Sequence, residues 1–231
     1  MGEYTSNVIV AGLDDSFAEN FDAAEIDSAR VTNFGIWVDE SGSMRIFEST
    51  MRGCLVHVKN AILGSKQADE IQVGVTRFSS QVTPGGYQPV NKMTDDYSAS
   101  GRTLLYDCIA DGAPRLLNYM NEQKANGTST QGIVVILSDG EDYGSHNRLR
   151  DAKAAIQDLL NAEVTVAFIA FGNEARGIAE KLGIPAENIK NVDATESELR
   201  SIFDLMSKSA ISASKNAANG NTAAGGFWDV N

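Results

Sequence analysis

The sequence predicts an α/β fold, in which a mostly parallel sheet is covered by helices on both faces. Short, fully apolar segments such as "IVVIL" at residues 133–137 recur along the 231-residue chain. They alternate with longer stretches whose apolar residues repeat at helical spacing. Strands buried on both faces of a parallel sheet are continuously apolar, and the helices that connect them cover those faces. The alternation therefore indicates a doubly wound sheet.

Five apolar runs are expected to form the main strands. They lie at residues 34–38, 71–78, 133–137, 164–171 and 189–192. A short strand pair, punctuated by Gly and Pro, is expected around residues 81–90. The first run, "FGIWV", is followed directly by "DESGS", so polar and flexible residues stand at the carboxyl end of a core strand.

The helices follow from apolar residues that recur every three or four positions. The first is marked by five such residues, Met51, Cys54, Leu55, Val58 and Ile62. Three more are expected at residues 149–160, 175–182 and 196–210. A further helix begins over residues 104–109, and Gly112 and Pro114 are expected to kink or divide it, because an interior proline lacks the N–H that a helix needs.

The two ends of the chain differ in composition from the middle. Residues 1–30 are acidic and weakly patterned, which indicates an N-terminal extension, and residues 31–211 form the domain. Residues 212–231 are rich in Ala, Asn and Gly, which predicts a flexible tail. Two readings of its aromatic pair, Phe227 and Trp228, stay open: docking on the chain's own domain, or capture as a short peptide by a partner.

The net charge and the cysteines of the chain limit its possible partners and its expected cellular location. A formal net charge of −12 argues against nucleic acid or an anionic membrane surface as the main partner. No apolar run has the length that a membrane span needs, and no secretory signal is expected. The two cysteines, Cys54 and Cys108, both fall in expected helices and are interpreted as reduced, packing thiols. A cytoplasmic location is therefore expected.

Three polar clusters are expected to meet at one rim of the sheet. Asp39, Ser41 and Ser43 follow the first strand, Thr103 stands before a helix in "GRTLLYD", and Asp139 ends the most apolar strand in "LSDGED". Ligands of open α/β sheets bind at the carboxyl ends of the strands, where the strand order reverses. Two carboxylates and three hydroxyls are hard oxygen ligands, which suit Mg²⁺, Mn²⁺ or Ca²⁺ and suit zinc poorly.

The charge balance of these ligands points to a further role. Two aspartates neutralise a divalent ion on paper, whereas hydroxyls add coordination without adding negative charge. The ion therefore keeps Lewis acidity and room for an outside ligand, and a carboxylate from a partner suits that position.

As a set, these motifs resemble the metal-ion-dependent adhesion site of the von Willebrand factor A (vWA) domain. The resemblance covers roughly residues 33–210. It implies a Rossmann-like sheet of six strands with one short antiparallel edge strand. It also implies that Ser41, Ser43 and Thr103 reach the ion through their hydroxyl oxygens, and that Asp39 and Asp139 are often linked to it partly through water.

Simpler interpretations of the rim residues stand beside the metal site. Asp39 and Ser41 are also favoured residues for capping the helix that follows. Glu40 and Glu141 could join the metal shell, but solvated rim residues are the default, and Asp107 and Asp142 are ambiguous between second-layer acceptors and surface charges. By default His146 is a surface loop residue.

The leading hypothesis is a protein-binding module, and not an enzyme, whose metal takes an Asp or Glu side chain from a protein partner. The first alternative is a metal-dependent phosphatase-like enzyme with Asp39 as nucleophile, although such enzymes need a second acid where this chain has Ser41. The second alternative is a structural subunit of an assembly with an AAA-type ATPase, which is an inference from relatives of the same family.

Overall fold

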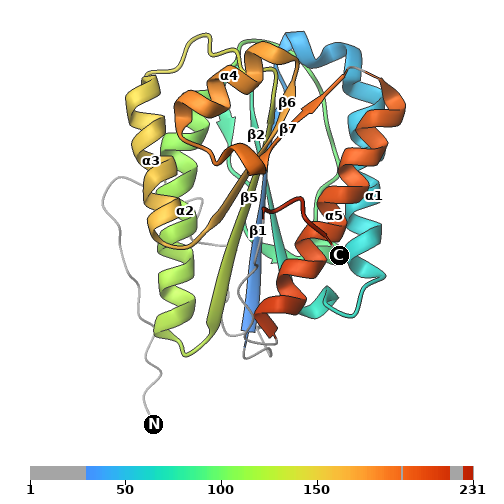
Figure 1. Cartoon of the computed structure of the whole chain (residues 1–231), viewed down its shortest axis with the longest axis vertical. Helices are drawn as coiled ribbons and strands as arrows, with labels where there is room; N and C mark the ends of the chain where they lie inside the picture. Colours follow the sequence, from blue (N-terminus) through green and yellow to red (C-terminus); the bar gives the residue numbers. More distant parts are fainter. Residues whose placement is uncertain (1–29, 194, 219–225, 231) are drawn as a thin grey trace.

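The computed structural model describes residues 30–193, 195–218 and 226–230, and their core is a mostly parallel sheet with helices on both faces (Figure 1). The strand order is β3-β2-β1-β5-β6-β7, with β4 also paired to β2. The expected doubly wound α/β fold is confirmed. The acidic extension of residues 1–29, residues 219–225 and Asn231 lie outside the described residues.

The strands lie close to the runs expected from the sequence. Their bounds are β1 Arg30–Asp39, β2 Ile71–Phe78, β3 Val82–Thr83, β4 Gln88–Pro89, β5 Ser129–Ser138, β6 Thr165–Phe171 and β7 Ile189–Val192. β1 pairs in parallel with both β2 and β5, and β5, β6 and β7 continue the parallel sheet. β3 and β4 pair with β2 in the antiparallel sense, so the expected short antiparallel edge consists of two pieces.

A bulge at Gly85 divides this antiparallel edge. Thr83 lies opposite Arg77, and Gln88 lies opposite Val73. Between these two pairs the edge segment therefore has one more residue than β2. A Cβ atom on Gly85 would lie 2.1 Å from the carbonyl oxygen of Val75. Only glycine permits so close an approach of two backbones, and the edge breaks there.

Five helices cover the sheet. Their bounds are α1 Glu48–Leu63, α2 Leu105–Ala125, α3 Leu149–Asn161, α4 Asn173–Leu182 and α5 Glu196–Ala218. α1 and α5 pack on one face, and α2, α3 and α4 pack on the other (Figure 1). Within the described residues, none of them combines the length and the apolar character that crossing a bilayer requires.

Successive side chains of each strand alternate between two separate hydrophobic cores, one on each face of the sheet. In β5, Ile133, Val135 and Leu137 belong to the core under α1 and α5, whereas Val134 and Ile136 belong to the core under α2, α3 and α4. Successive side chains of a strand point to opposite faces, so a run that is apolar at every position can fill both cores at once.

The expected division at Gly112 and Pro114 is wrong, because α2 runs as one helix through both residues. A Cβ atom on Gly112 would lie 2.8 Å from the ring of Trp37, so glycine allows the helix to approach the sheet closely. Cys108 before Pro114 and Leu116 after it are buried in the same core. Burial on both sides outweighs the ~3 kcal/mol that an interior proline costs.

The described parts of the predicted flexible tail have defined structure. α5 extends to Ala218 instead of ending near Ala210, and Phe227 and Trp228 are 9% and 4% exposed in the core under α5. The two rings meet edge to face with centroids 4.7 Å apart. The backbone N–H of Phe227 donates to the side-chain oxygen of Asn188 at 2.7 Å. Of the two readings of the aromatic pair, docking on its own domain is the observed one.

Cys54 and Cys108 are buried, free thiols, as expected for packing residues. They lie in different cores, on opposite faces of the sheet. Burial raises the pKa of the Cys54 thiol to about 11, which makes it a poor nucleophile.

We expect Trp228→Ala and Phe227→Ala each to lower the free energy of unfolding by about 3 kcal/mol, because each removes a buried aromatic ring from the core under α5. The matched control is Ile46→Ala, which removes a side chain on a residue that is 79% exposed. Urea unfolding of the full chain measures all three. An aromatic variant as stable as the control would contradict the docked position of the pair.

Candidate metal site at the carboxyl ends of β1 and β5

The site lies where the strand order reverses. From β1 the chain goes to β2 on one side, and β5 later returns to pair with β1 on the other side. Val38 of β1 lies opposite Leu137 of β5, so Asp39 and Ser138 end their strands side by side. This reversal is the place where open α/β sheets bind their ligands.

The carboxylate of Asp39 is fully buried and held at both oxygens. Its Oδ1 accepts a hydrogen bond from the backbone N–H of Ser41 at 2.8 Å, and its Oδ2 accepts one from the hydroxyl of Ser138 at 2.7 Å. Sequence reasoning missed Ser138. The available signal was a polar residue that closes an otherwise apolar run, one position before Asp139.

Burial raises the pKa of Asp39 to about 7, although the hydrogen bonds from Ser41 and Ser138 act in the opposite direction. The negative charge of Asp139 contributes to the same rise, so the two carboxylates are near enough to repel each other. A cation between them would relieve this repulsion.

Ser41 and Ser43 face each other at the start of a short 3-10 helix, Gly42–Phe47. Their hydroxyl oxygens lie 2.9 Å apart. Ser41 holds the N-cap position of this helix, yet its side chain makes no capping hydrogen bond. The simpler interpretation of Ser41 as a cap is therefore wrong, and its hydroxyl is turned to Ser43 instead.

Thr103 is held between the other two loops of the site. The loop before it is joined to the end of β1, because Ser100 N–H donates to the carbonyl of Glu40 at 2.7 Å and Gly42 N–H donates to the carbonyl of Gly101 at 3.2 Å. After it, Tyr143 N–H donates to the carbonyl of Thr103 itself at 2.7 Å. Thr103 is 4% exposed.

The loop that carries Asp139 turns sharply at Gly140. Gly140 has φ +83°, and a Cβ atom there would lie 2.4 Å from the Cα of Ala175 in α4. Its N–H donates to the Ser138 hydroxyl at 3.0 Å, and the N–H of Glu141 donates to the Asp139 carboxylate at 3.1 Å. Only glycine fits this turn.

The two ambiguous acids, Asp107 and Asp142, fasten this loop to α2. Asp107 is buried, and its carboxylate accepts the backbone N–H groups of His146 and Asn147 at 3.0 and 2.8 Å. In return, Asp142 accepts the N–H of Tyr106 at 3.0 Å. Burial raises the pKa of Asp107, but these hydrogen bonds outweigh it and hold the pKa below its ordinary value.

Two further expectations about rim residues have different outcomes. The side chain of Glu40 is only 15% exposed and lies 3.3 Å from that of Arg77, so the interpretation as a solvated rim residue is wrong. The side chain of His146 is 96% exposed, so the interpretation as a surface loop residue is confirmed.

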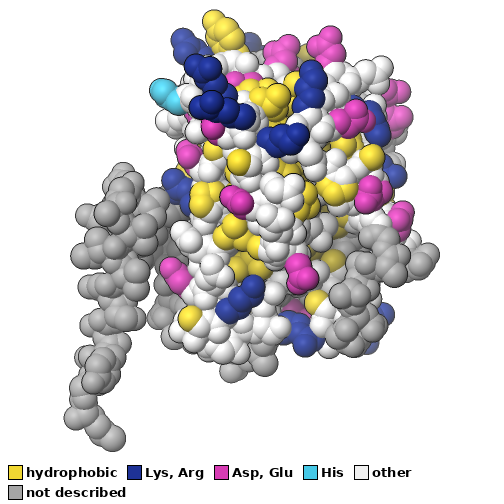
Figure 2. Space-filling model, turned by 60° about the vertical axis from the view of Figure 1, so that its left-hand side comes forward, with side chains coloured by type: hydrophobic (Ala, Val, Ile, Leu, Met, Phe, Trp, Pro, Cys, Tyr) yellow, Lys and Arg dark blue, Asp and Glu magenta, His cyan; other side chains and the backbone are white. Residues whose placement is uncertain are grey.

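A cleft of about 670 Å³ opens beside Asp139. Its lining includes three other acids, Glu141, Asp142 and Glu174, together with Lys181 and the exposed ring of Tyr143. Figure 2 shows Lys and Arg side chains gathered, alongside Asp and Glu, toward the upper end of the molecule, where β1 and β5 finish in Figure 1. This end of an acidic protein is therefore mixed in charge.

The oxygen donors of the site fit a hard divalent cation. Hydrogen bonds bring Asp39, Ser41 and Ser43 together, and the loop contacts bring Thr103 and Asp139 to the same rim. No group of three or more His, Cys, Asp or Glu suited to a metal ion occurs among the described residues. A site of two carboxylates and three hydroxyls suits Mg²⁺ or Mn²⁺. The metal role of the five residues stays a prediction.

Comparison with known proteins identifies the fold. No protein-family model matches the sequence. A probable bifunctional E2/E3 enzyme of Acanthamoeba polyphaga mimivirus is 23% identical over 130 residues, which are 56% of this chain and 10% of that protein. The chain therefore spans about a tenth of the length of this curated relative.

Three solved structures share the architecture. The pilus adhesin SpaC of Lactobacillus rhamnosus GG aligns with a TM-score of 0.65 and 10% identity over 79% of this chain and 30% of that chain. The vWF domain of the type V pili tip protein Mfa5 of Porphyromonas gingivalis aligns with a TM-score of 0.56 and 9% identity over 83% of this chain and 96% of that chain. The manganese-loaded TRAP protein of Plasmodium vivax aligns with a TM-score of 0.50 and 20% identity over 76% of this chain and 74% of that chain. The chain has a vWA-like fold.

We expect Asp39→Asn to make the metal-free protein more stable at neutral pH. Because the pKa of Asp39 is raised in the folded state, the folded chain holds a proton that the unfolded chain releases, so stability falls as pH rises from about 4 to about 7. One pKa unit corresponds to ~1.4 kcal/mol, so the loss is a few kcal/mol. Urea unfolding in EDTA at several pH values measures it. If wild type and variant lose stability in parallel over this range, Asp39 does not carry the raised pKa.

We expect Asp107→Asn to lower the free energy of unfolding by about 2 kcal/mol, because the loop then loses hydrogen bonds to a charged acceptor. Asp111→Asn is the matched control, because Asp111 is an exposed aspartate on the same helix whose pKa is raised by partial burial and then by the Asp107 charge. The control should be as stable as wild type or slightly more so. Equal losses in both variants, measured by urea unfolding, would refute the fastening role of Asp107.

Proposed function

We propose that this chain is a divalent-metal-dependent protein-binding module. Asp39, Ser41, Ser43, Thr103 and Asp139 would hold the ion, and when bound the ion supplies a positive coordination position for an Asp or Glu side chain of a protein partner. The observation that carries the proposal is the convergence of three loops at the end of β1 around a buried carboxylate. A buried acid whose pKa is raised by burial and by a neighbouring acid is a candidate for a functional site.

The comparisons support an interaction role and a divalent ion. SpaC is a pilus adhesin, Mfa5 is a pili tip protein, and the TRAP structure is loaded with manganese. We propose Mg²⁺ or Mn²⁺ for this chain, with Ca²⁺ as the third ion to test, since all three take oxygen ligands.

The charge of the chain limits the partner. A net charge of −12 repels a broadly acidic protein at long range. The free acids Glu141 and Glu174 beside Asp139 act in the same direction at short range. The partner would therefore present a lone carboxylate within a neutral or basic surface.

A phosphatase that uses Asp39 as its nucleophile would lack a residue that such an enzyme requires. Phosphatases of this kind need a second acid two residues after the nucleophile. Ser41 stands where the second acid is required. Lys181, in the cleft beside Asp139, is a feature that favours the enzyme. Turnover of a generic aryl phosphate that needs metal and disappears in Asp39→Asn would replace the binding proposal.

We propose a cytoplasmic location, which the two free cysteines support. An AAA-type ATPase assembly has no support among the comparisons, so the proposal does not include it. Affinity capture from the native cell, with and without EDTA, separates a metal-gated partner from a permanent assembly. A partner retained in EDTA and by Ser43→Ala would indicate the structural role.

We expect the wild-type chain to bind one divalent ion, and Ser43→Ala to weaken the binding tenfold or more. Ser43 is exposed, so its loss tests the ion and not the folding of the chain. The control is Ser49→Ala, an exposed serine at the start of α1. Calorimetric titration with Mg²⁺ and Mn²⁺ measures the affinities, and bound metal should raise the Tm. A wild-type chain that takes up no ion, or Ser43→Ala with unchanged affinity, would refute the metal site.

A further inference from the structure

We propose that Tyr97 and two ion pairs on neighbouring elements are positioning residues of the metal site, which fix the loop that carries Thr103 against the end of β1. None of them is proposed to touch the ion. They act through the segment of residues 94–101, whose backbone is bound on several sides. This inference rests on the proposed metal site and deepens it.

The loop needs an outside scaffold because it has none of its own. Between the 3-10 turn Val90–Lys92 and the start of α2, residues 93–104 form neither helix nor strand of the sheet. Loops of this length without secondary structure are uncommon and are usually functional. A metal ligand such as Thr103 must nevertheless be held within about 0.5 Å of its productive position.

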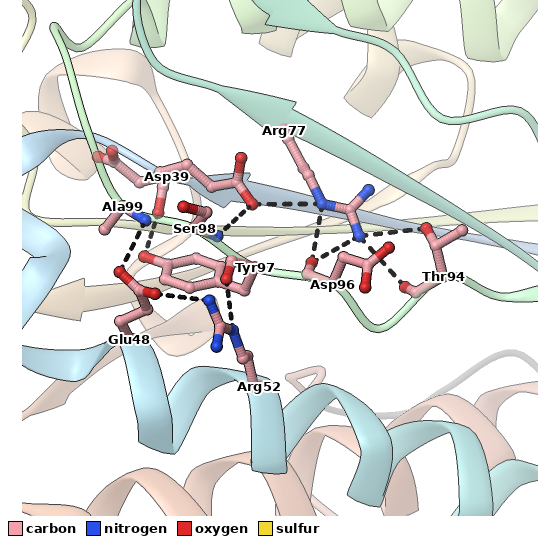
Figure 3. Close-up of polar contacts among 10 residues, drawn as sticks. Asp39, Glu48, Arg52, Arg77, Thr94, Asp96, Tyr97, Ser98 and Ala99 are labelled. Carbon is pink, nitrogen blue, oxygen red and sulfur yellow. Dashed lines mark hydrogen bonds and ion pairs between the residues drawn. The ribbon is translucent and has the colours of Figure 1, made fainter.

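Tyr97 joins the loop to the strand that carries Asp39. Its hydroxyl donates to the backbone carbonyl of Asp39 at 2.6 Å, and its ring is 2% exposed. Figure 3 shows the ring between the end of β1 and the first turns of α1. Burial, and then the charge of Asp39, raises the pKa of Tyr97 far above its ordinary value. A tyrosine hydroxyl is protonated at neutral pH even without this rise, so Tyr97 is a hydrogen-bond donor to Asp39.

The first ion pair lies on α1 and binds the loop on both sides of Ser98. Arg52 lies 2.6 Å from Glu48, and its Nε donates to the carbonyl of Tyr97 at 2.6 Å (Figure 3). The other carboxylate oxygen of Glu48 accepts the N–H of Ala99 at 3.2 Å. One pair thus fixes two backbone groups of the segment.

The second pair joins the ends of β1 and β2 to the same segment. Glu40 accepts the N–H of Ser98 at 3.2 Å, and Arg77 donates to the carbonyls of Asp96 at 2.8 Å and Thr94 at 3.3 Å (Figure 3). The side chains of Glu40 and Arg77 are only 15% and 17% exposed. Hydrogen bonds in which one partner is charged, as here, are stronger than those between neutral groups.

The pattern of contacts points to alignment and not only to packing. Nearly all the bonds are to backbone groups of one loop, the exception being the Thr94 hydroxyl, and Tyr97 bonds to the backbone of Asp39, whose carboxylate is the proposed metal ligand. The loop therefore moves with the end of β1, and Thr103 keeps its place relative to Asp39.

The test compares two tyrosines that lose the same group. Tyr97→Phe removes the hydroxyl that donates to Asp39, and Tyr119→Phe removes one that donates to Gln72 at 2.7 Å, where β2 begins, at the other end of the sheet. We expect both to lower the Tm of the metal-free protein by similar amounts. Only Tyr97→Phe should raise the Kd for Mn²⁺, by about tenfold, in a titration of the full chain well below its Tm.

A second variant guards against loss of folding in the first. Arg52→Lys keeps the charge on a side chain that is 54% exposed but removes the guanidinium that spans Glu48 and Tyr97. We expect it to fold like wild type and to raise the Kd for Mn²⁺ severalfold. If Tyr97→Phe fails to fold, the Arg52→Lys titration decides.

The possible failures are distinguishable. Wild-type affinity for Mn²⁺ in both Tyr97→Phe and Arg52→Lys would overturn the positioning role and leave the metal site intact. An equal loss of affinity in Tyr97→Phe and Tyr119→Phe would show a general effect of stability and would also overturn it. A wild-type chain that binds no Mn²⁺ overturns this inference together with the proposed function.

Discussion

The buried carboxylate at the end of the central strand is the constraint on which the rest of the site depends. An ionised acid is costly to bury unless its oxygens are paired, and Asp39 is fully buried beside a second acid, Asp139. Ser41 and Ser138 supply hydrogen bonds to its two oxygens, yet its pKa remains raised. The fold tolerates this cost at one position, where a cation would reverse it.

The sheet makes such a position available. β1 is central and its side chains fill two cores, so its last residue is surrounded by rigid neighbours on both faces. The parallel register with β5 then places Ser138 beside Asp39 without any contribution from the loops. The loops add the other candidate ligands and the hydrogen bonds that hold the loops in place. Functional residues are commonly carried by loops that a rigid scaffold positions.

The sequence predicts most of the sheet, because an apolar run needs no information from elsewhere in the chain. β2 and β7 match the expected bounds, and the three clusters of candidate ligands lie at one rim. What it does not predict depends on distant partners. Tyr97 binds a residue 58 positions away, and α2 continues through Pro114 because residues on both sides share one core. α5 runs past Ala210 through "ISASKNAA", which contains neither Gly nor Pro to end a helix.

Four acids near the rim hold its loops in place through hydrogen bonds to backbone N–H groups. Their carboxylates accept these N–H groups and so fix the backbone in place; these acids are Glu40, Glu48, Asp107 and Asp142. Asp39 and Asp139 are the carboxylates of the proposed ligand set, although each also accepts one backbone N–H group. With only two negative charges and three neutral hydroxyls, a divalent ion there would retain its attraction for an external acid. The proposed site for an external carboxylate is therefore compatible with an acidic protein, because four of the acids near the rim are already bound to the chain's own backbone.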